Sequence, residues 1–279
     1  MISIEKIKVE GWEQAIRGMR NPLDSWEKSD SLFYDFADDQ NFEVYCHDIN
    51  GGVKVFHPYE MDDWGYGRFN IGPNDLDLMM KLAKSGTEHA KYRRMIVVWM
   101  DITAPLYWWK EFDTYKVGTV ADSCSTMHTI ANKEFTPDDF SCEHLIDVAD
   151  TLNDLRDENV DANNFIDYAY KNNNNVPIVF TGCDSVLSPN GILNITILML
   201  NNCRGLYLKT KDKKYWWQLI QLLPSSYNQK RTVMLNYEVL ANIYRQRRNH
   251  KLDEWHAFCK MIEKKMPYSK LITLKEEEQ

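Results

Sequence analysis

The stretch PSSYNQKRTVMLNYEVLANIYRQR, residues 224–247, decides how this chain is interpreted. Its pattern predicts a helix over residues 232–248. Asn236 and Arg247 are eleven residues apart, close to three helical turns, so both side chains would project from nearly one face. Asn242 would lie on the flank of that face. Asparagine has poor helix propensity, so amides inside a helix indicate a role beyond helix formation.

A second informative stretch, APLYWWKEFDTYKVGTVADSCSTMH, covers residues 104–128. The residues before it, 91–103, predict a buried strand. Pro105 would start a helix well, because its φ is preset and it has no N–H to leave unpaired. We expect that helix to reach about Lys116 and Gly118 to break it. Unpaired backbone N–H groups at such a helix end and loop can bind phosphate oxygens.

Together the two stretches resemble the flavin-dependent thymidylate synthase (ThyX) family. Pro224, Asn236, Asn242 and Arg247 stand where that family has a Leu-Pro pair, two flavin-contacting asparagines and the arginine that contacts the uracil. The family's upstream motif leads from Ala-Pro through aromatic residues to Gln-Trp and Arg-His-Arg. It then continues with two residues, Ser, one residue, Asn-Glu, one residue, Ser, one residue and Arg.

The upstream motif is only partly kept. The matching positions are Ala104, Pro105, Tyr107 and Thr119. The substituted positions are Glu111 and Phe112 for Gln-Trp, Thr114, Tyr115 and Lys116 for Arg-His-Arg, Ala121 and Asp122 for Asn-Glu, Cys124 for the second serine and Thr126 for the last arginine. A further family arginine is replaced by Ile220 and Gln221. We therefore expect weaker phosphate binding unless another cation compensates, with Arg93, Arg94 and His128 as candidates.

The resemblance implies a role for each of these positions. Arg247 would be catalytic, because a fixed guanidinium stabilises negative charge that builds on the uracil ring. The implied dUMP-binding residues are Glu111, Thr114, Asp122, Ser123, Cys124, Ser125 and Thr126. The implied flavin-binding residues are Tyr115, Lys116, Asn236, Asn242 and His89, the last because Glu88-His89 resembles a Glu-His pair of the family. No metal site is implied.

The resemblance also implies a fold and a reaction. The fold would be α+β, a single domain over residues 1–279 with a mixed, mainly antiparallel sheet packed with helices. Residues 132–192 are acidic and rich in asparagine, and we interpret them as an inserted helical segment. The reaction would be reductive methylation of dUMP to dTMP with FAD, NADPH and methylenetetrahydrofolate. The assembly would be a cytoplasmic homotetramer with FAD bound where subunits meet.

Composition agrees with an ordinary globular protein. Of 279 residues, 44% are hydrophobic and 27% are charged, which argues against disorder. The net charge of −8 argues against a nucleic-acid-binding chain, because binding to phosphates needs surplus Lys and Arg. Six cysteines without a CxxC pair, and no apolar signal-peptide core, favour free thiols in a reducing cytoplasm. The longest apolar stretches, such as residues 95–100, have strand length, so no membrane partner is expected.

Local patterns predict further elements. Residues 41–59 predict a hairpin, because Asn50-Gly51-Gly52 accept positive φ at little cost. Residues 192–200 match either a buried strand or the start of a helix. We expect a strand over residues 2–10 and helices over residues 11–21, 74–84, 142–155, 211–223 and 250–267.

Alternative interpretations remain for the site and the function. Arg247 could be a surface arginine beside Arg245 and Arg248, and the two asparagines could be packing or solvated amides. For Cys124 we expect a small buried thiol rather than a nucleophile. The chain could be a non-catalytic nucleotide- or flavin-binding relative, since arginines are missing. A weaker alternative, given the net acidity, is an aromatic-rich module that binds protein or nucleic acid.

Overall fold

The computed structural model describes residues 2–34, 44–56, 69–146 and 188–274. The chain divides into two compact units, each of which is described by itself. The sheet unit comprises residues 2–103, 110–123 and 230–279, and the helical unit comprises residues 104–109 and 124–229. A single domain over residues 1–279 and an insertion over residues 132–192 stay predictions.

The main sheet has the strand order β1-β6-β8-β7. Its strands are β1 (Ser3–Glu10), β6 (Val97–Pro105), β8 (Asn228–Asn236) and β7 (Val120–Ser123). β1 runs antiparallel to β6, and β7 runs antiparallel to β8. β8 lies antiparallel to β6. Thr232 Oγ1 donates to Asp101 and Tyr237 N donates to Ile96 O, so the partners in β6 come earlier as the position in β8 comes later.

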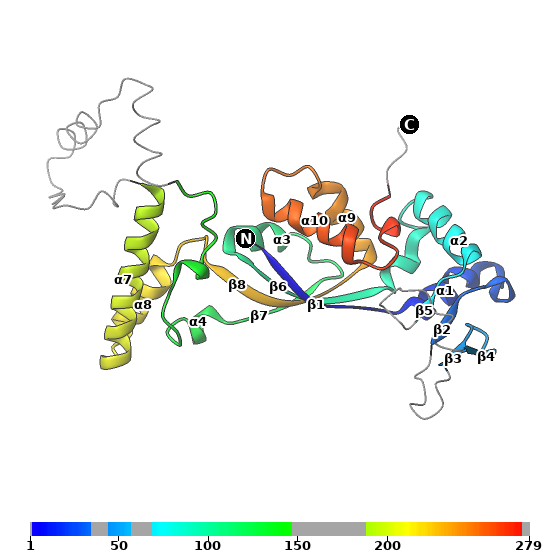
Figure 1. Ribbon diagram of the computed structural model, residues 1–279, viewed down its shortest axis with the longest axis horizontal. Coiled ribbons are helices and arrows are strands. Elements are labelled where there is room, and N and C mark those ends of the chain that lie inside the picture. The colour runs from blue at the N-terminus through cyan, green and yellow to red at the C-terminus, as the bar shows by residue number, and fades with distance from the viewer. Residues whose placement is uncertain (1, 35–43, 57–68, 147–187, 275–279) are drawn as a thin grey trace, which may run out of the picture. The chain divides into compact units, whose positions relative to one another are not determined.

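Burial alternates along β6, as expected for a sheet with one covered face. Val98, Met100 and Ile102 are buried, whereas the residues between them are only partly buried. On the covered side lie α9 (Tyr237–Arg247) and α10 (Asp253–Lys265), side by side in Figure 1. This packing holds α9, which carries Arg247, firmly over the sheet.

A second, antiparallel sheet has the order β4-β3-β2-β5. Its strands are β2 (Leu32–Tyr34), β3 (Val44–His47), β4 (Val53–Phe56) and β5 (Phe69–Asn70). The predicted hairpin is confirmed: Asp48 Oδ1 accepts from the N–H groups of Asn50 and Gly52, and Gly51 has φ 85°. A residue with a Cβ would be strained at that φ, which accounts for the glycine.

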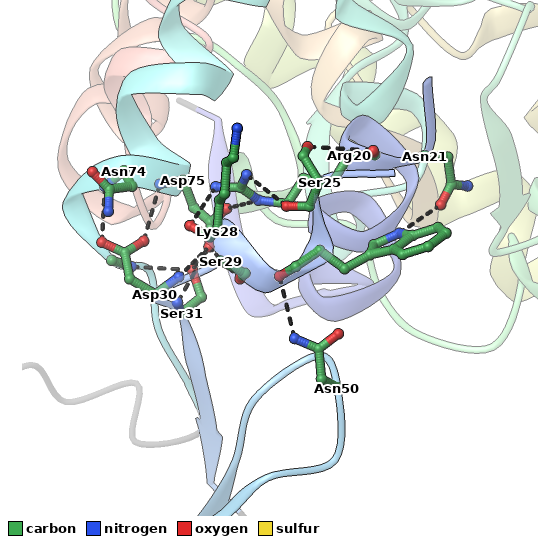
Figure 2. Close-up of polar contacts among 12 residues, drawn as sticks. Arg20, Asn21, Ser25, Lys28, Ser29, Asp30, Ser31, Asn50, Asn74 and Asp75 are labelled. Atoms are coloured by element: carbon green, nitrogen blue, oxygen red, sulfur yellow. Dashed lines mark hydrogen bonds and ion pairs between the residues drawn. The ribbon is translucent and has the colours of Figure 1, made fainter. Parts of the chain in front are cut away.

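A buried ion pair joins α1 (Trp12–Arg20) and α2 (Pro73–Lys84) in the sheet unit (Figure 2). The same unit contains short 3-10 helices at Asn21–Leu23, Trp26–Lys28, Ala90–Arg94 and Ser269–Leu271. Arg20 Nε lies 2.6 Å from Asp75 Oδ1. The other two guanidinium nitrogens donate to the carbonyls of Ser25 and Lys28, so the pair fixes the loop after α1 to the start of α2.

The helical unit is built around α7 (Pro189–Thr210) and α8 (Lys213–Leu222), which pack against each other (Figure 1). Ser188 and Asp212 cap the two helices through their side chains. The helical interpretation of residues 192–200 is correct, since α7 buries Leu193, Ile197 and Leu200 at helical spacing. The other elements here are α4 (Thr126–Thr129) and a 3-10 turn at Pro137–Asp139, while α3 (Leu106–Phe112) passes from this unit into the sheet unit.

Several predicted boundaries were wrong. The helix expected over residues 232–248 begins only at Tyr237, because residues 228–236 form β8. The strand expected over residues 91–103 begins at Val97, after a 3-10 turn. The helix starting after Pro105 ends at Phe112 rather than near Lys116.

Other expectations are settled in part. Of the helix expected over residues 142–155, the described residues 142–146 are not helical and the rest lie outside the described residues. The predicted helices at residues 11–21, 74–84, 211–223 and 250–267 are confirmed as α1, α2, α8 and α10. Across the described ranges, none of the helices has both the length and the apolar character that a membrane span needs.

Candidate functional site

Arg247, in the last turn of α9, is held by two residues from the segment around the end of α3. Its Nε donates to Tyr115 Oη at 2.8 Å, and its Nη1 donates to Glu111 Oε2 at 2.8 Å. The guanidinium carbon also lies 5.7 Å from the ring centroid of Tyr115 and 4.9 Å from that of Trp255. Contacts of this kind fix both the position and the orientation of the cation. Within the described part of the chain, Nη2 has no hydrogen-bond partner.

Glu111 is the centre of this cluster. Its Oε2 accepts from Arg247 Nη1 and from Trp255 Nε1, the latter at 2.8 Å, and lies 3.4 Å from His250 Nε2. His250 Nδ1 accepts from the N–H of Leu252, so a neutral His250 carries its proton on Nε2, facing Glu111. Oε1 of Glu111 has no partner among the described residues, and the side chain is 33% exposed. The carboxylate thus has one committed oxygen and one available oxygen.

A chain of hydrogen bonds continues from Arg247 to Asn242. Tyr115 Oη donates to Gln246 Oε1 at 2.9 Å, and Gln246 Nε2 donates to Asn242 Oδ1 at 3.0 Å. Asn242 Oδ1 also accepts from Arg245 Nη2 at 3.2 Å. Its amide nitrogen makes no hydrogen bond with the described residues, so Asn242 keeps a donor for a ligand.

Three members of the cluster escaped prediction: Gln246, His250 and Trp255. Gln246 could have been found, because it follows Asn242 by four residues and side chains at that helical spacing meet. His250 and Trp255 carry no local signal. They join the cluster because α10 packs Trp255 against Phe112, with ring centroids 6.5 Å apart.

Asn236 is not inside the helix that carries Arg247, so the prediction that both residues project from one helix was wrong. It is the N-cap of α9, and its Oδ1 accepts from the N–H of Val239 at 3.0 Å. The loop after Tyr115 passes close to this cap. Gly118 has φ 78°, and a Cβ there would lie 3.0 Å from Asn236 Nδ2, so both the backbone angle and the close approach require glycine.

The other predicted residues of the sheet unit lie around this cluster or away from it. Thr114 Oγ1 donates to the Glu111 carbonyl at 2.7 Å. Lys116 is exposed, and its ammonium makes no ion pair or hydrogen bond with the described residues. Asp122 and Ser123 are exposed on the edge strand β7. No described contact joins His89, exposed in a turn, to Arg247.

Cys124, Ser125 and Thr126 belong to the helical unit. Gln229 Nε2 donates to Cys124 O at 3.0 Å and to Thr126 Oγ1 at 3.2 Å. Ser125 is the N-cap of the single-turn helix α4. Cys124 is exposed, so the expectation of a buried thiol was wrong.

The candidate replacement cations also differ in their surroundings. Arg93 is 6% exposed and its Nη1 donates to Glu238 Oε2 at 3.4 Å, so its charge is used inside the fold. Arg94 and His128 are exposed.

Comparison with known proteins identifies a shared fold. No family model matches the chain, and no curated protein matches it. Two solved structures of ThyX thymidylate synthase from Helicobacter pylori, both with FAD and dUMP, are similar over almost the whole length. One is 14% identical and has a TM-score of 0.53, covering 99% of this chain and 98% of its own. The other is 12% identical and has a TM-score of 0.51, covering 97% of this chain and 98% of its own. The predicted α+β fold class is confirmed.

Proposed function

We propose that this chain is a flavin-dependent thymidylate synthase that methylates dUMP to dTMP with methylenetetrahydrofolate as carbon donor and NADPH as reductant. The observation that carries the proposal is the state of Arg247, which is fixed in position but keeps Nη2 uncommitted. The full-length likeness to two structures that contain FAD and dUMP supports it. We also propose a cytoplasmic homotetramer with FAD bound where subunits meet.

The donor and the acceptor of the cluster that have no protein partner suit a pyrimidine. Arg247 Nη2 offers a donor and Glu111 Oε1 offers an acceptor. A uracil edge presents carbonyl acceptors beside an N–H donor, which is the complementary pattern. Arg247 would then stabilise negative charge on the ring as C5 becomes nucleophilic. Thr114, Asp122 and Ser123 would complete the substrate contacts within the sheet unit.

Some of the predicted flavin residues fit that role and one fits it poorly. Asn242 keeps its amide nitrogen, and Lys116 keeps an exposed ammonium that could pair with a phosphate as a point charge. Asn236 has committed its oxygen to capping α9, so only its amide nitrogen remains. Tyr115 and His89 complete the proposed set. A bound flavin would supply the hydride transfer, while these side chains would orient it.

The test is purification followed by substrate-dependent reduction. A yellow protein whose flavin absorbance is bleached by NADPH, and more readily with dUMP present, supports the proposal. Arg247→Ala should lower dTMP formation by about 100-fold or more while leaving flavin content unchanged. Lys251→Ala, an exposed cation in the loop after α9, is the control and should retain activity. A colourless protein that cannot be loaded with FAD would overturn the proposal.

A second candidate, a non-catalytic relative that binds nucleotide or flavin, is favoured by one contact. The Arg247 charge is already paired with Glu111 at 2.8 Å, which leaves less charge for a developing anion. The missing arginines of the upstream motif point the same way. Growth of a thymidine-requiring host separates the candidates, since a binder would leave that host dependent on thymidine.

A further inference from the structure

A groove between the end of α9 and α10 lies outside the cluster around Arg247. It is an open groove with a volume of about 390 Å³, within the range of small-molecule sites. Its lining residues are Tyr244, Arg248, Asn249, His256, Cys259, Lys260, Glu263 and Lys264. His256, Lys260 and Lys264 follow each other at four-residue spacing, so they line one side of α10.

The charge in this groove is unbalanced. Arg248, Lys260 and Lys264 make no ion pair or side-chain hydrogen bond with the described residues. Glu263 is the one lining carboxylate, and it accepts a hydrogen bond from Tyr244 Oη at 2.6 Å. Three cations therefore line the groove against one carboxylate, in a chain whose net charge is −8. An anion between them would relieve their repulsion.

Helix ends explain only part of this arrangement. Arg248 caps α9 and Lys264 lies in the last turn of α10, where the helix dipole favours cations. Lys260 is in the middle of α10 and has no such reason. Cys259 and Tyr244 also line the groove and are neutral at neutral pH, and burial raises the pKa of each further, to about 12.

From this geometry we infer that the groove is a binding site for a phosphate-bearing small molecule, held by Arg248, Lys260 and Lys264. The inference does not depend on the proposed thymidylate synthase reaction, because none of these residues belongs to the cluster around Arg247. Cations on two helices can contact different oxygens of one phosphate, which a single surface lysine does not do.

The test is a calorimetric titration of the full chain with inorganic pyrophosphate. We expect saturable binding with one site and a dissociation constant below about 1 mM. Lys260→Gln/Lys264→Gln should weaken that binding by about tenfold or more. The matched control, Lys251→Gln/Lys270→Gln, removes the same charge from exposed residues outside the groove and should stay within about twofold of the parent.

Two further variants make the test decisive. Glu263→Gln removes the opposing charge but keeps an acceptor for Tyr244, and should tighten binding by about threefold. If the double variant unfolds more readily than the parent, Lys260→Gln alone replaces it. Ribose 5-phosphate and AMP as second ligands distinguish a sugar phosphate from a nucleotide. Equal losses in the groove and control variants, or no saturable binding by the parent, would overturn the inference whatever the flavin content.

Discussion

Two of the arginine–carboxylate pairs in the sheet unit differ in how completely their atoms are used. In the pair Arg20–Asp75 the side chains are 4% and 0% exposed, and Asp75 Oδ2 accepts from Ser29, Asp30 and Ser31 (Figure 2). In the pair Arg247–Glu111 the side chains are 18% and 33% exposed.

The difference separates a structural pair from one that can bind a ligand. All three nitrogens of Arg20 donate to protein oxygens, so a ligand could bind only by breaking the fold. Arg247 Nη2 and Glu111 Oε1 have no partner among the described residues. A ligand at this second pair would add hydrogen bonds without displacing any.

The largest expected effect comes from breaking the saturated pair. Asp75→Ala should lower the free energy of unfolding by about 3–5 kcal/mol, because Arg20 would remain as a buried, unpaired charge. Urea unfolding of the two proteins measures the change. Asp77→Ala is the matched control: its exposed pair with Lys81 should contribute less than about 0.5 kcal/mol. Equal losses in the two variants would contradict the structural role of Asp75.

A smaller stability effect is expected at the exposed pair. Arg247→Ala should lower the free energy of unfolding by about 1–2 kcal/mol, since Glu111 keeps Trp255 as a donor and stays partly solvated. The same urea series measures it. A loss as large as that of Asp75→Ala would show that Arg247 serves the fold rather than a ligand.

The thiol of Cys259, on α10, gives a pH-dependent test of stability. Burial raises the pKa of Cys259 from 9.0 to about 12. Above pH 9 the thiol ionises in the unfolded chain but stays neutral in the folded one. The stabilisation of the folded state by the neutral thiol is therefore fully present below pH 9 and is lost toward pH 12. The slope from one such group is at most about 1.4 kcal/mol per pH unit. Urea unfolding between pH 8 and pH 11 should show a shallower decline in Cys259→Ala, and parallel curves would contradict the burial of this thiol.

The smallest expected effect is a change in dUMP affinity at the Arg247–Glu111 pair. Glu111→Gln keeps an acceptor for Arg247 and Trp255 but replaces the free Oε1 by an amide nitrogen, which donates instead of accepting. We expect binding of dUMP, measured by calorimetry, to weaken by about three- to tenfold, because the uracil N–H would lose its acceptor. An unchanged or tighter affinity would contradict the proposed contact between Glu111 Oε1 and the ligand.

Local chemistry made part of the fold predictable. The hairpin at Asn50-Gly51-Gly52 and the helix α2 were found because turn residues and apolar spacing act within a few neighbours. The boundary at Asn236 was missed, because its side chain caps a helix that begins where β8 ends, and β8 is a strand only through its pairing with non-local partners.

The sequence by itself determined which residue types could form the site, since Glu111, Tyr115, Asn242 and Arg247 were all named from the resemblance of two stretches to the motifs of the ThyX family. Only the tertiary structure decided their relationships. Glu111 and Arg247 are 136 residues apart, and Trp255 reaches Glu111 through the packing of α10. Ion pairs and hydrogen bonds depend on distances of a few ångströms, and such distances between remote segments follow from packing rather than from spacing along the chain.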